Sequence, residues 1–384
     1  MKKVSSSNGL EKCPKLRFSE FNDEWKQIKL STIFQKNTKK NKDGLCTNVI
    51  SNSAKNGLIP QSEYFDKDIA NSENTNGYYI IKENDFVYNP RKSIETPYGP
   101  ISRYTYKEDG IVSPLYLCFH SKSQIEPLYY EKYFKSSVWH RYIYMSGDSG
   151  ARHDRVSIRD DIFFDMPIFA PNMVEQNMIA SFLELIDQKI QKQQQLVELL
   201  KKYKIGLSNK IFNEYLSDCE YINFDNLFFT ISDKPYQVNS NEYESEGLFE
   251  IVDQGKKLIV GYTDKKEKLF TEIPIIVFGD HTTILKYRCE PFVVGGDGVK
   301  LITTKTNNNL LYLFYALEHF NIKSEGYKRH YSILKEISLP IPTQQQQLKF
   351  AELLQTIDSR IIKESDTLNK YIMQKKGLLQ GLFI

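Results

Sequence analysis

The chain has 384 residues, with 51 lysines and arginines against 48 aspartates and glutamates and a formal net charge of +3. This length allows two to three domains, and a mildly basic balance permits nucleic-acid binding without demanding it. Residues 1–9 are polar, no stretch approaches the roughly 18 apolar residues of a membrane span, and the five cysteines are widely scattered. These features argue against a secretory signal, a disulfide framework and a zinc site, so we expect a soluble, cytoplasmic protein without a metal.

The first predicted domain covers residues 14–170, after a polar tail at 1–13. Short runs rich in β-branched and aromatic residues recur within it and are separated by Gly, Asn and Asp turns. The clearest runs are 78–81, 85–88 and 111–119, and an aromatic stretch with helical character follows at 127–144. Such a mixture predicts an α/β domain of the mixed α+β kind.

Residues 171–212 form a long predicted helix that occurs twice in the chain. Placed on residues 342–383 at an offset of 171 without a gap, twelve of 42 positions are identical, whereas unrelated segments would agree at about three. The identical pairs include Pro171/Pro342, Gln176/Gln347, Asp187/Asp358 and Lys204/Lys375. The chain is therefore two tandem halves, each a domain followed by a spacer helix.

Both copies carry an apolar stripe with a 3.5-residue period, which is the pattern of a coiled-coil seam. A polar residue interrupts the stripe at the same two places in each copy, and such residues specify register. We therefore predict an antiparallel intramolecular helix pair. The alternative is that each helix only caps its own domain. The predicted seam residues are Ile179, Leu183, Ile186, Ile190, Val197, Leu200, Leu207, Ile211, Phe350, Leu354, Ile357, Ile361, Leu368, Tyr371, Leu378 and Leu382.

The second predicted domain covers residues 213–341 and is followed by the second spacer helix, 342–384. It also reads as mixed α/β, with β-rich runs at 258–262, 273–278 and 292–294 and a helical stretch at 310–320. Its opening and its end resemble those of the first domain, but the interiors do not align by eye. The two helices are alike while the two domains differ. This suggests two recognition domains of different specificity, held by equivalent helices.

No segment carries a convincing catalytic motif, so we predict a protein that is not an enzyme. Residues 89–92 begin like the Asn-Pro-Pro-aromatic motif of adenine methyltransferases but lack its second proline and its aromatic residue. The glycine-rich residues 295–300 lack the spacing of a phosphate-binding loop. Ser149, His153 and Asp154 are a chance grouping in a polar loop, with no nucleophile elbow.

The whole pattern resembles the specificity subunit of type I restriction-modification enzymes. The resemblance rests on the opening Pro-Lys-Leu-Arg-Phe at 14–18 with Trp25 and Leu30, on residues 110–116, and on the helix starts 167–176 and 339–347. It covers essentially the whole chain, although Gln346 stands where the family usually has Glu. It implies two target-recognition domains in a circular pseudo-twofold arrangement, each reading one half of a split DNA target.

The same resemblance implies double-stranded DNA and two methyltransferase subunits as partners, together with restriction or translocase subunits. S-adenosylmethionine, ATP and Mg²⁺ would then belong to the partner subunits, and this chain would need no cofactor. A coiled-coil scaffold that holds two protein partners without touching DNA is the rival hypothesis. A self-contained methyltransferase is a second rival that the missing motifs disfavour.

Cationic and aromatic side chains near corresponding domain ends are candidates for DNA contact, because arginine binds phosphate or guanine bidentately and lysine supplies charge. The alternative for each is an ordinary solvated surface charge. The candidates are Arg91, Lys92, Arg152, His153, Arg155, His281, Lys286, Tyr287, Arg288, Lys328, Arg329 and His330.

Overall fold

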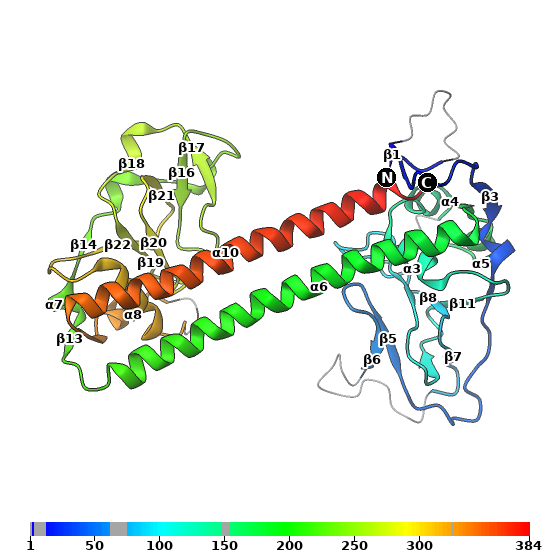
Figure 1. Cartoon of the computed structure of the whole chain (residues 1–384), viewed down its shortest axis with the longest axis horizontal. Helices are drawn as coiled ribbons and strands as arrows, with labels where there is room; N and C mark the ends of the chain where they lie inside the picture. Colours follow the sequence, from blue (N-terminus) through cyan, green and yellow to red (C-terminus); the bar gives the residue numbers. More distant parts are fainter. Residues whose placement is uncertain (1, 4–12, 62–74, 148–153, 325, 327) are drawn as a thin grey trace. The chain divides into compact units, whose positions relative to one another are not determined.

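The computed structural model describes residues 2–3, 13–61, 75–147, 154–324, 326 and 328–384 (Figure 1). The chain divides into two compact units. Unit 1 comprises Met1–Gln193 with Thr367–Ile384, and unit 2 comprises Gln194–Asp366. The domain boundaries expected from the sequence stay a prediction, because each long helix is shared between the two units.

Unit 1 is built on an antiparallel four-stranded sheet, flanked on one side by smaller β pairs and on the other by helices. The sheet order is β4 (Phe34–Lys36), β11 (Leu117–Ser121), β8 (Phe86–Tyr88), β9 (Ile101–Arg103). The smaller pairs are β5 (Ile50–Ser53) with β6 (Gly57–Pro60) and β7 (Tyr79–Ile81) with β10 (Gly110–Val112). The helices are α1 (Leu30–Ile33), α3 (Pro127–Lys135), α4 (His140–Ser146) and α5 (Asp160–Phe164). Four further short strands form two pairs. They are β1 (Lys2–Lys3) with β2 (Leu16–Arg17), and β3 (Lys26–Lys29) with β12 (Pro167–Ala170).

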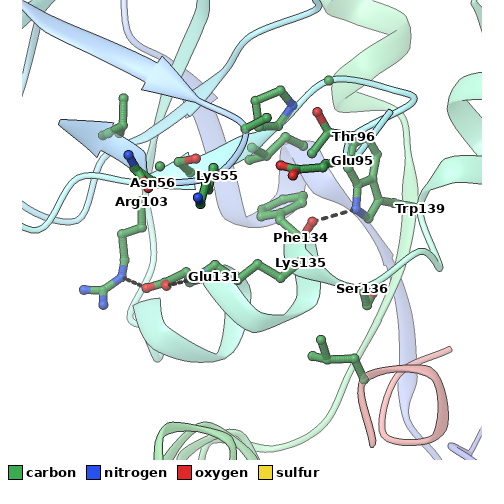
Figure 2. A pocket seen from close by; sticks show the side chains of 18 of the residues that line it. Lys55, Asn56, Glu95, Thr96, Arg103, Glu131, Phe134, Lys135, Ser136 and Trp139 are labelled. Carbon is green, nitrogen blue, oxygen red and sulfur yellow. Dashed lines mark hydrogen bonds and ion pairs between the residues drawn. The ribbon is translucent and has the colours of Figure 1, made fainter. Parts of the chain in front are cut away.

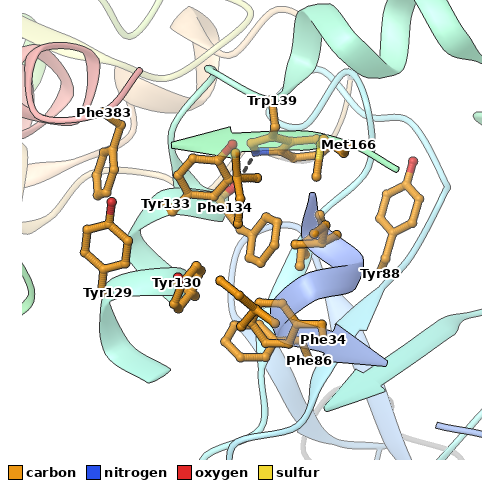
Figure 3. Close-up of a cluster of buried hydrophobic side chains, with 14 of the residues drawn as sticks. Phe34, Phe86, Tyr88, Tyr129, Tyr130, Tyr133, Phe134, Trp139, Met166 and Phe383 are labelled. Atoms are coloured by element: carbon orange, nitrogen blue, oxygen red, sulfur yellow. Dashed lines mark hydrogen bonds between the residues drawn. The ribbon is translucent and has the colours of Figure 1, made fainter. Parts of the chain in front are cut away.

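The central strand β8 is buried on both faces, which explains its uninterrupted apolar run. Phe86 and Tyr88 join the aromatic core on the helical side of the sheet (Figure 3), whereas Val87 joins a second core with Ile81 and Val112. Side chains alternate between the faces of a strand, so one strand serves two cores. Aromatic rings of this kind bury large areas, and edge-on pairs add roughly 0.5–1.5 kcal/mol each.

Unit 2 repeats this plan. Its antiparallel sheet has the order β14 (Phe228–Ile231), β22 (Val299–Thr304), β19 (Ile275–Gly279), β20 (Leu285–Arg288). The second layer contains β15 (Gln237–Val238), β16 (Phe249–Val252), β17 (Gly261–Thr263), β18 (Leu269–Phe270) and β21 (Phe292–Gly295). The helices are α7 (Phe224–Leu227), α8 (Leu310–His319) and α9 (Tyr331–Leu334), and β13 (Tyr221–Asn223) pairs with β23 (Ser338–Pro340). Three 3₁₀ turns, Lys234–Tyr236, Ser240–Glu242 and Lys266–Lys268, lie in the connections.

The two interiors share a topology that inspection of the sequence does not reveal. In each unit the first, fourth, second and third strands in chain order form the main sheet. In unit 2, β16 runs parallel to β21, and in unit 1 the residue before β5, Val49, makes a parallel bridge to Ile111 of β10. The interiors are therefore equivalent in their strand pairing although their residues have diverged.

Two long helices carry the repeated segments. They are α6 (Met173–Asn209), which a π-helical stretch at Lys210–Tyr215 continues, and α10 (Gln344–Gly381). Every seam residue named above is buried or half-buried. No helix in the described part of the chain is both long enough and apolar enough to cross a membrane.

The helices pair antiparallel within each unit. In unit 1 the Lys375 ammonium pairs with the Asp187 carboxylate, and the Lys189 ammonium lies 4.1 Å from the centre of the Tyr371 ring. In unit 2 the Lys204 ammonium lies 2.9 Å from the Asp358 carboxylate. Residue numbers rise along α6 as they fall along α10, which defines the antiparallel direction.

The first turns of each helix also pack on the domain that precedes them. Ile179 and Leu183 belong to the aromatic core of unit 1, and Ala351 and Leu354 belong to the main core of unit 2. The last turns pack on a domain as well, because Leu382 belongs to the aromatic core of unit 1 and Ile211 to the main core of unit 2. The capping alternative therefore describes both ends of each helix, and the seam describes the middle.

Candidate nucleic-acid interface

Four segments of unit 1 converge beside the ends of three strands. They follow β5, β8 and β10 and include residues 154–156, which precede α5. Together they line a hollow of about 380 Å³. Loops at strand ends carry binding residues because a rigid scaffold positions them without using their side chains for packing.

Asparagine side chains fix the first two of these segments to each other. The Asn52 amide donates to the Val87 carbonyl over 2.8 Å, and the Asn89 amide donates to the Asn52 carbonyl over 3.2 Å. The Asn89 side-chain oxygen in turn accepts the Arg91 backbone N–H over 3.1 Å, an Asx turn that sets the course of the loop.

The structure brings Arg91 and Arg155 together, although 64 positions separate them. They form an isolated antiparallel bridge, and the flanking hydrogen bonds run from Lys92 N to Asp154 O and from Val156 N to Pro90 O, both 2.8 Å. Arg91 and Lys92 are exposed and Arg155 is half-buried. The candidates Arg152 and His153, and with them Ser149, lie outside the described residues.

A second and larger hollow in unit 1, about 540 Å³, has a different electrostatic character (Figure 2). The Glu131 carboxylate lies between the Arg103 guanidinium, 2.8 Å away, and the Lys135 ammonium, 2.5 Å away. Burial raises the pKa of the Glu131 carboxyl, but Lys135 and Arg103 outweigh burial and hold that pKa below its ordinary value. Arg103 and Lys135 are therefore neutralised within the protein, so this hollow is a weaker candidate for an anionic partner.

Unit 2 presents the equivalent loops after β16, β19 and β21, and Gln254 joins all three. Its side-chain oxygen accepts the His281 backbone N–H over 3.2 Å, and its amide donates to the Asp297 carbonyl over 3.1 Å. The Thr282 hydroxyl donates to the Gln254 backbone carbonyl. A Cβ at Gly279 would lie 2.7 Å from that carbonyl, so only glycine allows this approach.

The fourth segment of unit 2 ends at His330, ahead of α9. The Asp280 carboxylate accepts the backbone N–H groups of His330 and Tyr331 over 2.8 and 2.7 Å. His281 Nδ1 lies 3.2 Å from the Lys328 carbonyl. Lys328 and Arg329 are exposed, whereas His330 is fully buried.

Other residues that sequence reasoning grouped with His281 point into the protein. The Lys286 ammonium donates to the Asp253 and Lys257 carbonyls over 2.7 and 2.6 Å, and burial lowers its pKa. The Arg288 guanidinium lies 2.7 Å from the Glu250 carboxylate. We therefore assign Lys286 and Arg288 to holding the loops in place, not to direct DNA contact.

Tyr287, the residue between them, is half-buried. Its ring centre lies 5.5 Å from that of Phe314, and burial raises the pKa of its hydroxyl to about 12.

Sequence reasoning missed the residues that build the loops, namely Asn52, Asn89, Gln254 and Asp280. Each is polar and lies in or directly after a buried strand, and that position is the signal that could have found them. Among the described residues, no group of His, Cys, Asp and Glu side chains gathers as a metal site.

Comparison with known proteins identifies the family of one segment of the chain. Residues 216–372 match the family model for the type I restriction modification DNA specificity domain. This segment, which contains most of unit 2, therefore belongs to the type I restriction modification DNA specificity domain family. A sequence search of curated proteins found no match to this chain.

Solved structures share its fold over nearly the whole length. A crystal structure of a type I restriction-modification system S subunit from M. genitalium aligns with a TM-score of 0.61 at 16% identity, covering 97% of this chain and 99% of that one. A structure described under complex assembly and conformational transition of the type I R-M system aligns with a TM-score of 0.54 at 12% identity, covering 92% and 96%. At these identities the likeness concerns the fold.

Proposed function

We propose that this specificity protein reads a bipartite DNA target, with the four-loop edge of each unit contacting one half-site. One observation carries the proposal. The same edge is built twice on the same strand topology, but it presents Arg91, Lys92 and Arg155 in unit 1 and His281, Lys328 and Arg329 in unit 2. Equal frames with different side chains suit two different half-sites.

The exposed faces of the long helices are proposed to bind methyltransferase subunits, one for each half of the repeat. Large apolar side chains are exposed there, including Leu185, Leu199 and Ile205 on α6 and Ile362 and Met373 on α10. Exposed apolar groups that recur along a helix are typical of a protein interface. Restriction or translocase subunits would join the same assembly.

We propose that the chain itself performs no catalysis. The Asn89 amide, which begins the methyltransferase-like residues 89–92, is bonded within the loop frame and is not free to hold a substrate amino group. Gly296 and Gly298 have positive φ angles of 62° and 83°, as expected of a turn. The methyl donor, ATP and Mg²⁺ are assigned to the partner subunits.

The test is a domain replacement. Residues 213–341 are replaced with the matching segment of a relative of different specificity, and methylation is mapped in cells that also carry the methyltransferase partner. We expect one half of the methylated sequence to change and the other to stay, because each edge contacts its own half-site.

Three outcomes would contradict the proposal. A change in both halves would mean that the units do not read independently. Methyl transfer by the purified chain alone, given methyl donor and duplex DNA, would show that it is an enzyme. A protein scaffold without DNA recognition would show no salt-sensitive duplex binding in the assembled complex.

A further inference from the structure

The charged side chains that line the 380 Å³ hollow of unit 1 in the described part of the chain are all cationic. Among the described residues, its lining contains Arg91, Lys92 and Arg155 and no aspartate or glutamate. Hydroxyl groups of Ser51 and Tyr116 share the lining. The larger hollow of the same unit contains Glu95 and Glu131, so the absence of acidic side chains is specific to this site.

The two arginines are held face to face. Residues opposite each other in an antiparallel bridge place their Cβ atoms about 5 Å apart on the same side, and like charges there are destabilising. The acidic group nearest to Arg155, the Asp154 carboxylate, is 3.9 Å from its Nε and exposed, so it offsets little of this repulsion. Within the described ranges, neither the Arg91 guanidinium nor the Lys92 ammonium has an acidic partner.

The backbone beneath these charges is fixed before any ligand arrives. The Asn89 side chain orients the Arg91 amide, and the two 2.8 Å bonds between segments 90–92 and 154–156 flank the bridge. Side chains on a fixed frame lose less entropy on binding, which favours affinity. The site is therefore arranged for an anion small enough to contact both guanidiniums.

We propose that Arg91 and Arg155 together clamp one phosphodiester of the DNA backbone next to the half-site of unit 1. A guanine edge accepts hydrogen bonds from arginine but is neutral, so it would leave the mutual repulsion of three cations uncompensated. A phosphodiester brings a negative charge and free oxygens for both guanidinium forks. The clamp fixes the position of unit 1 along the DNA and leaves sequence discrimination to neighbouring side chains. This inference rests on the proposed function and specifies one contact within it.

The experiment uses the assembled complex of the specificity protein with its methyltransferase partner and a duplex that contains the mapped target. Affinity is measured at salt concentrations between about 50 and 200 mM for the wild type, Arg91→Ala, Arg155→Ala and the double variant. We expect each single variant to bind about ten-fold more weakly. The double variant should reduce the slope of log K against log salt by about 1, and the methylated sequence should not change.

Two further variants keep the test sharp. Arg91→Lys retains the charge without the fork, so its salt slope should match the wild type while its affinity falls. Lys42→Ala removes an exposed lysine ahead of β5, away from the hollow, and controls for the general loss of one charge. Thermal unfolding of each variant confirms that the unit still folds.

An unchanged slope with a relaxed half-site would show that the arginines read a base, and the clamp would be wrong. An unchanged slope and an unchanged sequence would show that they are solvated surface charges, which also overturns it. If the wild-type complex itself lacks sequence-specific binding, the proposed function fails, and that result is distinct from either of these.

Discussion

At the scale of single residues, the two copies of the repeated helix share buried hydrogen bonds at identical positions. The Gln176 amide donates to the Pro171 carbonyl over 3.0 Å, and the Gln347 amide donates to the Pro342 carbonyl over 2.9 Å. The side-chain oxygen of Gln347 accepts a backbone N–H from Asn309, the residue that caps α8, over 2.9 Å. Both glutamines are buried, so each polar atom needs such a partner.

The departure at Gln346 has an equally local reason. In unit 1 the corresponding Glu175 carboxylate accepts from Arg17 over 2.7 and 2.8 Å and from the Trp25 indole over 3.2 Å, all buried. Gln346 is exposed and accepts instead from the Thr343 backbone over 3.1 Å. With no arginine to pair, a charge at position 346 would gain little.

Gln254 is the residue whose loss should matter most for recognition by unit 2. Gln254→Ala removes both side-chain bonds that join the three loops, so we expect affinity for the target to fall about ten-fold. Methylation mapping should show relaxed discrimination in one half-site only. Gln254→Glu keeps the acceptor for the His281 N–H but loses the donor to the Asp297 carbonyl. Its affinity should therefore lie between those of the wild type and Gln254→Ala.

Gln195→Ala is the matched control, because Gln195 is an exposed glutamine on α6. A change in the half-site of unit 1, or an unchanged target, would rule out a positioning role for Gln254.

At the scale of elements, the seam of the helix pair contains the same polar contact twice. Asp187 pairs with Lys375 in unit 1, and Asp358 pairs with Lys204 in unit 2, with the repeat exchanging the two roles. A residue from the preceding domain joins each pair. Lys132 of α3 lies 2.7 Å from Asp187, and the Tyr315 hydroxyl of α8 lies 2.9 Å from the Asp358 carboxylate. These contacts fix the helix register and join each domain to the helix pair through a polar contact.

Removing one of these charges should destabilise unit 1. Asp187→Asn leaves Lys375 without its carboxylate and the buried Lys132 with Glu184 alone, so we expect a loss of about 1–3 kcal/mol in the free energy of unfolding. Asp366→Asn on the exposed face of α10 is the control and should change stability by less than about 0.5 kcal/mol. Denaturant unfolding measures both.

The pH dependence follows from the same contact. Burial raises the pKa of Asp187, but Lys132 and Lys375 outweigh burial and hold that pKa below its ordinary value. A carboxyl group whose pKa is lower in the folded than in the unfolded state stabilises the fold at pH values above its unfolded-state pKa, which is near 4. This stabilisation is lost as the pH falls through the folded-state pKa. The difference in stability between wild type and Asp187→Asn should therefore shrink in acid. A difference that stays constant between about pH 7 and 3 would exclude the ion pair as its cause.

At the scale of the whole molecule, α6 and α10 are each continuous through the division between the units. A continuous helix pair can fix a spacing, which a flexible linker cannot. We expect this pair to determine the number of unspecified base pairs between the two half-sites.

Lengthening both helices tests that role. Seven residues inserted after Gln195 and seven after Asp366 preserve the 3.5-residue period and add about 10 Å at 1.5 Å per residue. One base-pair step is about 3.4 Å, so the gap in the methylated sequence should grow by about three base pairs with both half-sites unchanged. A matched pair of insertions in which apolar seam positions are replaced by polar ones is the control for an intact seam. An active variant with the original gap would show that the helices only connect the units.

The sequence by itself determined the two tandem halves, the seam and the family resemblance. The buried residues of a helix lie three and four positions apart, so the apolar pattern is local and can be read directly. Strand pairing is non-local, and strands such as β8 and β19 are buried on both faces, so their residues carry no alternation from which a topology follows. Only the tertiary structure decided that the two interiors share one strand order. It also decided which cations face a hollow and which are buried. The Lys286 ammonium binds carbonyl groups about 30 positions away, while Arg91 and Arg155 meet in an open hollow. The burial of a charge depends on partners from distant segments, and no local pattern records them.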